Sequence, residues 1–94
     1  MYQLVFNNAA LVSIAKYKKS NKPSYNKVMK ILEELHLYTR IGIWKPEPLK
    51  GFDGNVYSRE INKKYRLIYE ISDEQIKTFI ISAKGHYNDK WIFK

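Results

Sequence analysis

This sequence contains no cysteine, so it can form neither a disulfide framework nor a thiolate metal site, and we expect a cytoplasmic location. No apolar run approaches the roughly 20 residues that a membrane span needs, so we expect no membrane contact. The segment Met1–Ala15 lacks a basic start and is interrupted by Asn7-Asn8, which argues against a signal peptide. A P-loop, a Rossmann glycine pattern, zinc spacing and a nucleophile elbow are also missing, which excludes the enzyme classes that depend on them.

Acidic residues are scarce, with 9 Asp and Glu against 17 Lys and Arg, and the formal net charge is +8. A charge of this size favours a polyanionic partner, which can be nucleic acid, an anionic membrane or an acidic protein. Only Arg40, Arg59 and Arg66 are arginines. Because a guanidinium offers a rigid, bidentate fork, each of the three is a candidate for specific work.

The chain has 94 residues and a hydrophobic fraction of 45%, which predicts one domain over residues 1–94. Alternation over 2–6 predicts a strand, and a helix is expected from Ala9 to about Lys19, capped by Asn7 or Asn8. Its expected inner face holds Leu11, Ile14 and Ala15. A second helix is expected from Pro23, with the apolar stripe Val28, Ile31, Leu32 and Leu35.

The second half of the sequence is typical of strands. Gly42–Gly54 is predicted to be a loop, and strands are expected over Val56–Asn62, Tyr65–Ile71 and Gln75–Lys84. The tail Trp91-Ile92-Phe93 is a candidate for a short C-terminal edge strand. The order β-α-α-β-β-β predicts an α+β fold, in which an antiparallel sheet packs on a helical hairpin and leaves its other face open.

Four residues together have the chemistry needed to cleave RNA through its own 2′-hydroxyl. This reaction requires a base for the 2′-proton, an acid for the departing 5′-oxygen, and a cation for the charge on phosphorus. Glu47 can be the base, His86 the acid, and Arg66 the phosphate ligand. Tyr87 can orient the phosphate, stack on a base or assist proton transfer.

Each residue also has a structural explanation. Glu47 between two prolines can be a solvated loop carboxylate, Arg66 a surface cation on a sheet, and His86 a hydrogen-bonded histidine near a strand end. The surrounding charge favours the functional reading, because segment 40–66 holds seven basic residues against three acidic ones. This balance is typical of a phosphate-binding groove and adds Lys63 and Lys64 to the RNA-binding candidates.

Several motifs resemble one known family. Lys45-Pro46-Glu47-Pro48-Leu49-Lys50, Ser58-Arg59, Tyr65-Arg66-Leu67-Ile68-Tyr69 and His86-Tyr87 are similar to the motifs of the YoeB/Txe branch of RelE-type toxins. The resemblance implies a RelE-like fold and a metal-independent endoribonuclease that cleaves mRNA in the ribosomal A site and inhibits translation. It implies no cofactor.

The resemblance also implies roles and partners. Glu47 corresponds to the general base, Arg66 to the phosphate-binding arginine, His86 to the general acid and Tyr87 to the terminal tyrosine. Lys50 and Arg59 correspond to basic positions around the site, and Lys45 at the start of the first motif is a further RNA-binding candidate. The implied partners are a YefM-like antitoxin, the ribosome with its mRNA, and a second copy of the chain in a homodimer.

The sequence departs from the family pattern at Glu60, where relatives usually carry a second arginine, and in the segment Asn88–Lys94 that follows the His-Tyr pair. A carboxylate beside a phosphate site weakens RNA binding by repulsion. The alternatives are therefore a catalytically weak or inactive protein of the same fold that binds an antitoxin or another protein, and an RNA-binding module without catalysis.

Overall fold

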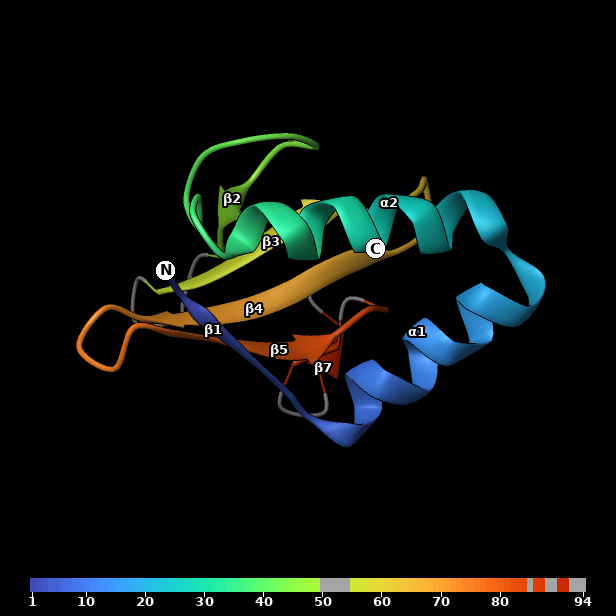
Figure 1. The fold of residues 1–94 in the computed structure, drawn as a ribbon. Helices are drawn as coiled ribbons and strands as arrows, with labels where there is room; N and C mark the ends of the chain where they lie inside the picture. The colour runs from blue at the N-terminus through green and yellow to red at the C-terminus, as the bar shows by residue number, and fades with distance from the viewer. Residues whose placement is uncertain (50–54, 85, 88–89, 92–94) are drawn as a thin grey trace.

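The protein places two helices on one side of a twisted sheet (Figure 1). A computed structural model describes residues 1–49, 55–84, 86–87 and 90–91, the last two pairs by their backbone. The elements in chain order are β1 (Gln3–Phe6), α1 (Asn8–Ser20), α2 (Lys22–Leu35), β2 (Glu47–Pro48), β3 (Val56–Glu60), β4 (Arg66–Ser72), β5 (Lys77–Ser82), β6 (His86–Tyr87) and β7 (Lys90–Trp91).

Both helices begin at asparagine caps. The side chain of Asn7 accepts a hydrogen bond from the Ala10 N–H at 3.0 Å, and that of Asn21 accepts one from the Ser24 N–H at 3.2 Å. All four members of the stripe predicted for α2 are buried, which confirms that prediction. The predicted inner face of α1 is wrong for two of its three residues, because Leu11 is 49% exposed and Ala15 is exposed as well, and only Ile14 is buried. The buried face of α1 consists of Ala10, Ser13, Ile14 and Tyr17.

The main sheet has five strands in the order β1-β5-β4-β3-β2. The α+β class is confirmed, but the sheet is mixed rather than purely antiparallel. β1 runs parallel to β5, with Gln3 opposite Lys77 and Phe6 opposite Ile80, whereas the other neighbouring pairs are antiparallel. A parallel pair needs a long crossover, and the helical hairpin belongs to the chain that connects these two strands.

Two expectations about the second half need correction. The segment Gly42–Gly54 is not entirely loop, because Glu47 and Pro48 form β2 and pair with Ser58 and Tyr57 of β3. Prolines fit there because an edge strand does not need all its N–H groups. In the tail, Trp91 and its neighbour Lys90 form β7, which pairs with β6 in a separate two-stranded sheet, whereas Ile92 and Phe93 lie outside the described residues.

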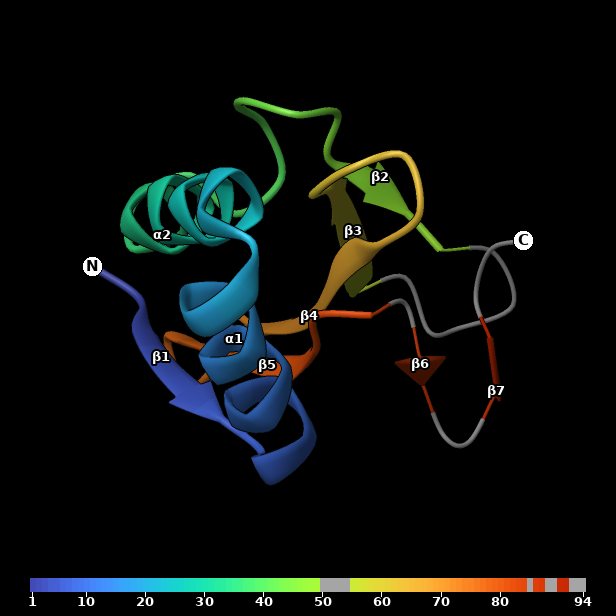
Figure 2. The same ribbon diagram turned by 90° about the vertical axis from the view of Figure 1, so that its right-hand side faces the viewer.

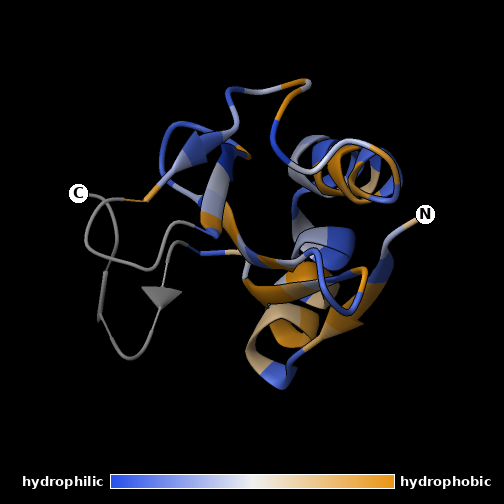
Figure 3. Cartoon of the chain, turned by 90° about the vertical axis from the view of Figure 1, so that its left-hand side faces the viewer, coloured by the Kyte–Doolittle hydropathy of each residue, from blue (hydrophilic) through white to orange (hydrophobic). Residues whose placement is uncertain are grey.

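The core lies between the helices and the sheet. Apolar residues of α1 and α2 pack there against Leu67, Tyr69 and Ile80 of β4 and β5. Figure 3 shows hydrophobic colour along the helices and central strands and hydrophilic colour at the β3–β4 turn. Figure 2 shows β6 and β7 on the side of the sheet away from the helices. That side is not uniformly open, since Val56 and Ile68 on it are 3% and 0% exposed.

Candidate active site

A row of paired residues crosses the face of the sheet that points away from the helices. Glu47 of β2 lies opposite Ser58 of β3, Ser58 opposite Ile68 of β4, and Ile68 opposite Ser82 of β5. Directly paired residues share a face, and residues two apart on a strand share it too. Arg66 is two residues from Ile68, so the sheet register brings Arg66 and Glu47 onto the same face.

Arg66 and Glu47 form an ion pair there. The Nη2 of Arg66 lies 3.3 Å from Oε1 of Glu47 and 3.2 Å from the Lys45 carbonyl oxygen, and its Nε donates to the Ser58 hydroxyl at 2.8 Å. The side chain of Arg66 is 16% exposed, and that of Glu47 is 59% exposed. The guanidinium is therefore held in a defined orientation by three acceptors, while the carboxylate remains accessible to a ligand.

The backbone that leads to Glu47 is strained. Trp44 and Lys45 have φ angles of 55° and 54°, which lie in the left-handed region. Such residues cost about 1–3 kcal/mol each and persist where their surroundings hold them. The Trp44 carbonyl accepts from the Glu60 N–H at 2.9 Å, and the Lys27 ammonium lies 4.9 Å from the centre of the Trp44 ring. The Lys45 carbonyl is one of the acceptors of Arg66.

The remaining residues predicted for the site lie outside the pair formed by Arg66 and Glu47. His86 and Tyr87 form β6, which contacts β5, and the structure describes their backbone. Lys50 lies outside the described residues.

Lys63 and Lys64 are exposed in the turn that joins β3 to β4, at the same end of this hairpin as Arg66. The Lys45 side chain is also exposed. Lys45, Lys63 and Lys64 thus leave their ammonium groups available for phosphates.

Arg59 does not belong to the candidate site. Arg59 is 0% exposed and lies on the helix side of the sheet, where its guanidinium forms an ion pair with Glu34. Its guanidinium also donates to the carbonyl oxygens of Tyr38 at 2.6 Å and Ile41 at 2.9 Å, and to the Tyr69 hydroxyl at 3.1 Å. The prediction that Arg59 contacts RNA is therefore corrected, because adjacent residues of a strand point to opposite faces.

Glu60 places a negative charge on the same face of the sheet as Arg66. It pairs directly with Arg66 across the β3–β4 hairpin, so the two residues share the face of the candidate site. Glu60 is partly buried. A second carboxylate therefore accompanies Glu47 near the guanidinium and lowers the local positive potential.

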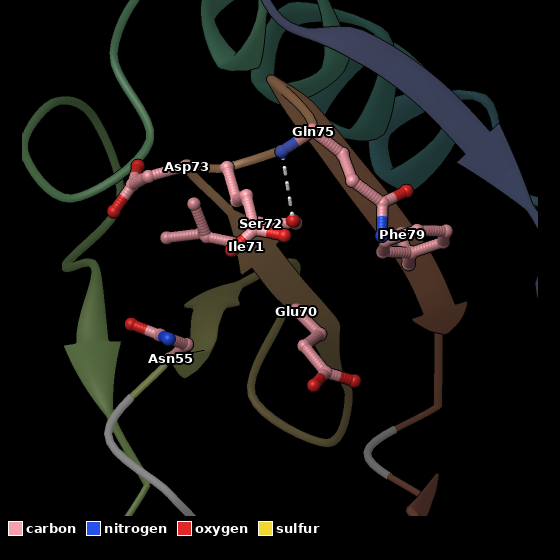
Figure 4. A pocket seen from close by; sticks show the side chains of 8 residues that line it. Asn55, Glu70, Ile71, Ser72, Asp73, Gln75 and Phe79 are labelled. Atoms are coloured by element: carbon pink, nitrogen blue, oxygen red, sulfur yellow. Dashed lines mark hydrogen bonds between the residues drawn. The ribbon is translucent and has the colours of Figure 1, made fainter.

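A pocket of about 510 Å³ lies elsewhere, at the turn between β4 and β5 (Figure 4). Its carboxylates are Glu70, Asp73 and Glu74. The hydrogen bond from Arg40 is the main reason that the pKa of Asp73 is below its usual range, with a further contribution from Tyr2, so this carboxylate is charged at neutral pH. The pocket is unsuited to phosphate because its lining is acidic.

The sequence analysis did not predict that Ser58 belongs to the site, where its hydroxyl accepts a hydrogen bond from Arg66. Strand alternation could have indicated this contact, because it places Arg59 on the helix side of the sheet and its neighbour Ser58 on the same face as Arg66. The described residues contain no group of three or more His, Asp or Glu side chains placed to hold a metal ion. No helix within the described ranges is long and apolar enough to cross a membrane.

Solved structures of small toxins have the same arrangement of helices and strands. The chain is 30% identical to the chain of a Staphylococcus aureus YoeB dimer, with a TM-score of 0.78 over 92% of this chain and 98% of that one. It is 31% identical to a chain of a YoeB–YefM complex from Staphylococcus aureus, with a TM-score of 0.76 over 93% and 99% of the two chains. The fold is that of the YoeB and RelE toxins.

Sequence comparison agrees with the structural one. A family model described as YoeB-like toxin of bacterial type II toxin-antitoxin system matches residues 6–87. A toxin YoeB from Streptomyces coelicolor is 26% identical over 90% of this chain and 99% of its own length. A toxin YoeB from Synechocystis is 48% identical over 46 residues, which span 49% of this chain and 51% of that protein. The chain belongs to the YoeB-like family of toxins of bacterial type II toxin–antitoxin systems.

Proposed function

We propose that this toxin is a metal-independent endoribonuclease that cleaves mRNA in the ribosomal A site and thereby inhibits translation. The observation that carries the proposal is the meeting of Glu47 and Arg66, 3.3 Å apart, on the sheet face away from the helices. A protein that only binds RNA needs cations but has no need of an accessible carboxylate against an arginine that three acceptors hold in place. Members of this toxin family are generally endoribonucleases.

The reaction assigns one task to each residue. Glu47 takes the proton from the 2′-hydroxyl, and the 2′-oxygen attacks phosphorus as the bond to the 5′-oxygen breaks. His86 gives a proton to that leaving oxygen, so the products are a 2′,3′-cyclic phosphate and a 5′-hydroxyl. Arg66 binds the phosphate oxygens on which charge develops, and Tyr87 orients the phosphate or stacks on a neighbouring base.

The ion pair of the free protein has a consequence for this reaction. Arg66 cannot give Nη2 fully to a phosphate while it pairs with Glu47 at 3.3 Å. A phosphodiester that enters the site competes with Glu47 for the guanidinium, and its binding releases the carboxylate for proton abstraction. Lys45, Lys50, Lys63 and Lys64 hold the message and the ribosomal RNA by charge, without reading a sequence.

The proposed protein partners are those of similar structures. The Staphylococcus aureus relatives are a YoeB dimer and a YoeB–YefM complex. For this chain we propose a YefM-like antitoxin that neutralises it with a partly disordered segment, and a homodimer in the absence of antitoxin. All of these partners meet the toxin in the cytoplasm.

A cell-free translation reaction tests the proposed activity. The protein is added beside Glu47→Ala, Arg66→Ala and His86→Ala, and the ends of the message are mapped by primer extension. We expect cuts at codon-defined positions in translated message, reduced at least about 100-fold in each variant. Arrest of translation with intact message would refute the nuclease assignment.

Glu60 favours a second candidate, a toxin of weak or absent nuclease activity that acts by binding a protein. Its carboxylate shares the site face with Arg66 and opposes phosphate binding. The same translation reaction separates the two candidates, because the second predicts translation arrest with few or no new message ends from the parent protein, and new ends only once Glu60→Arg removes the repulsion.

A further inference from the structure

The helix side of β3 carries a buried polar cluster that the proposed reaction does not use. Its centre is Arg59, which is 0% exposed and donates to the carbonyl oxygens of Tyr38 at 2.6 Å and Ile41 at 2.9 Å. Glu34, near the end of α2, supplies the counter-charge. The cluster therefore ties α2 and the segment that follows it to β3, the strand beside the edge strand β2.

Glu34 and Tyr69 extend the cluster to more of the segment 38–43. Oε1 of Glu34 accepts from the Ile43 N–H at 3.0 Å as well as from Arg59. The Tyr69 hydroxyl accepts from Nε of Arg59 at 3.1 Å and donates to the Thr39 carbonyl oxygen at 2.8 Å. The backbone from residue 38 to residue 43 is thus attached to buried side chains at several points.

Gly42 completes the cluster by having no side chain. Its φ angle is 132°, and a Cβ atom there would lie 1.6 Å from Oε1 of Glu34 and 3.1 Å from Nη1 of Arg59. Any other residue would displace the carboxylate from the guanidinium and would also adopt a strained backbone conformation. Glycine is therefore required for the ion pair to form in this position.

The cluster ends where the candidate site begins. Ile43, held by Glu34, directly precedes the left-handed residues Trp44 and Lys45. The Trp44 carbonyl is bound by the N–H of Glu60, the neighbour of Arg59 in β3, and the Lys45 carbonyl is bound by Arg66. Strand β3 thus holds this segment through Arg59 on one face and through its own backbone at the next residue.

We propose that Glu34, Gly42 and Arg59 are positioning residues, which fix the strained turn at Trp44–Lys45 and so place Glu47 and the Lys45 carbonyl against Arg66. Any effect on catalysis rests on the proposed nuclease function, whereas the effect on the turn does not. A buried guanidinium without acceptors is costly, so the segment 38–43 and Arg59 hold each other in place.

Gly42→Ala tests the proposal without removing a charge. Hydrogen exchange is followed at three amides that report on the turn and on β2, those of Ile43, Glu60 and Leu49, which donate to Glu34, Trp44 and Val56 respectively. We expect exchange at these amides to rise about tenfold or more, while the amides of β4 and β5 keep their rates. Cleavage of message is expected to fall about 10- to 100-fold, through kcat rather than KM.

Asp73→Asn is the matched control, because it breaks another arginine–carboxylate pair that involves the same segment. Asp73 pairs with Arg40 at 2.8 Å on the surface, with side-chain exposures of 58% and 35%. We expect this variant to leave both exchange at the three reporter amides and cleavage unchanged. Equal effects of Asp73→Asn and Gly42→Ala would overturn the proposal.

Other outcomes are equally decisive. Unchanged exchange in Gly42→Ala overturns the proposal, and so does a uniform rise that includes β4 and β5, which marks a general stability role. If Gly42→Ala does not fold, Glu34→Gln replaces it, since the amide keeps the acceptor oxygen but not the charge. Exchange at Ile43 should then rise about threefold, because a neutral acceptor is weaker, and no rise would overturn the proposal. If the parent protein does not cleave message, the nuclease proposal fails while the exchange data still decide this one.

Discussion

At the scale of single residues, the site depends on which face of β3 and β4 each side chain occupies. Arg59 and Arg66 have the same chemistry, but one is buried under α2 and the other lies beside Glu47. The difference comes from the hairpin register, in which Glu60 pairs with Arg66 and Arg59 with Leu67. Residue type alone therefore does not distinguish the proposed phosphate ligand, Arg66, from the buried Arg59, whereas the strand register does.

Glu60→Arg is expected to raise activity. The change replaces a negative charge by a positive one on the site face, beside Arg66, and should tighten RNA binding about fivefold or more. The measurement is the rate of message cleavage at several salt concentrations. The variant should also show a steeper salt dependence than the parent, because it neutralises additional phosphate charge. Glu60→Gln controls for loss of the carboxylate alone and should lie between the two, and equal or lower activity of Glu60→Arg would contradict this account of position 60.

At the scale of elements, the helical hairpin supplies the platform on which the site face is built. The apolar stripe of α2 packs on the sheet, and Tyr17 of α1 donates from its hydroxyl to the Ala83 carbonyl at 2.6 Å, just after β5 ends. Ala83 lies between Ser82 of the site row and β6, which carries His86. The helices thus support both the sheet and the segment that leads to the proposed acid.

The stripe of α2 should contribute much of the stability. Leu35 is 0% exposed, so Leu35→Ala should lower the free energy of unfolding by about 2–5 kcal/mol through lost burial and a cavity. Leu37, which is 60% exposed, provides a matched control, and Leu37→Ala should change that free energy by less than about 0.5 kcal/mol. Urea unfolding of the three proteins measures both effects. Equal losses in the two variants would contradict the assignment of the helix face.

Tyr17 should make the free energy of unfolding fall at alkaline pH. Burial raises the pKa of Tyr17 to about 12 from its ordinary value of 10.0, so the unfolded chain loses this proton at lower pH than the folded one. The stabilisation is fully present below pH 10 and declines as pH rises from about 10 to about 12. Urea unfolding across this range should show a smaller decline in Tyr17→Phe, which cannot ionise at this position. An identical decline in the variant would assign the effect to other groups, of which Tyr69, whose pKa burial also raises, is one.

The sequence predicts the elements better than it predicts their contacts. The α2 stripe, the strand regions and the α+β class follow from periodicity and from the turn residues, and the structure confirms them. The parallel pairing of β1 with β5, the strand formed by Glu47 and Pro48, and the burial of Arg59 do not follow from it. Each of these depends on contacts between distant segments, which local patterns do not encode.

At the scale of the whole molecule, the protein is a basic toxin whose helices and candidate site occupy opposite sides of one sheet. In the proposed function, the net charge of +8 attracts RNA without choosing a sequence, and the pair of Glu47 and Arg66 supplies the proposed base and phosphate ligand. The pocket at the turn between β4 and β5, whose lining includes Glu70, Asp73 and Glu74, has the wrong charge for phosphate. Charge and register together, rather than cavity shape, identify the candidate site.

The most direct test of this account is single-turnover cleavage on purified ribosomes that carry a defined message in the A site. The parent protein, Glu47→Ala and Arg66→Ala are compared on normal message and on message with a 2′-deoxynucleotide at the cut position. We predict that the parent cuts normal message to a 2′,3′-cyclic phosphate, that the deoxy message stays intact, and that both variants are at least about 100-fold slower. Cleavage of the deoxy message, or undiminished cleavage by Glu47→Ala, would contradict the account.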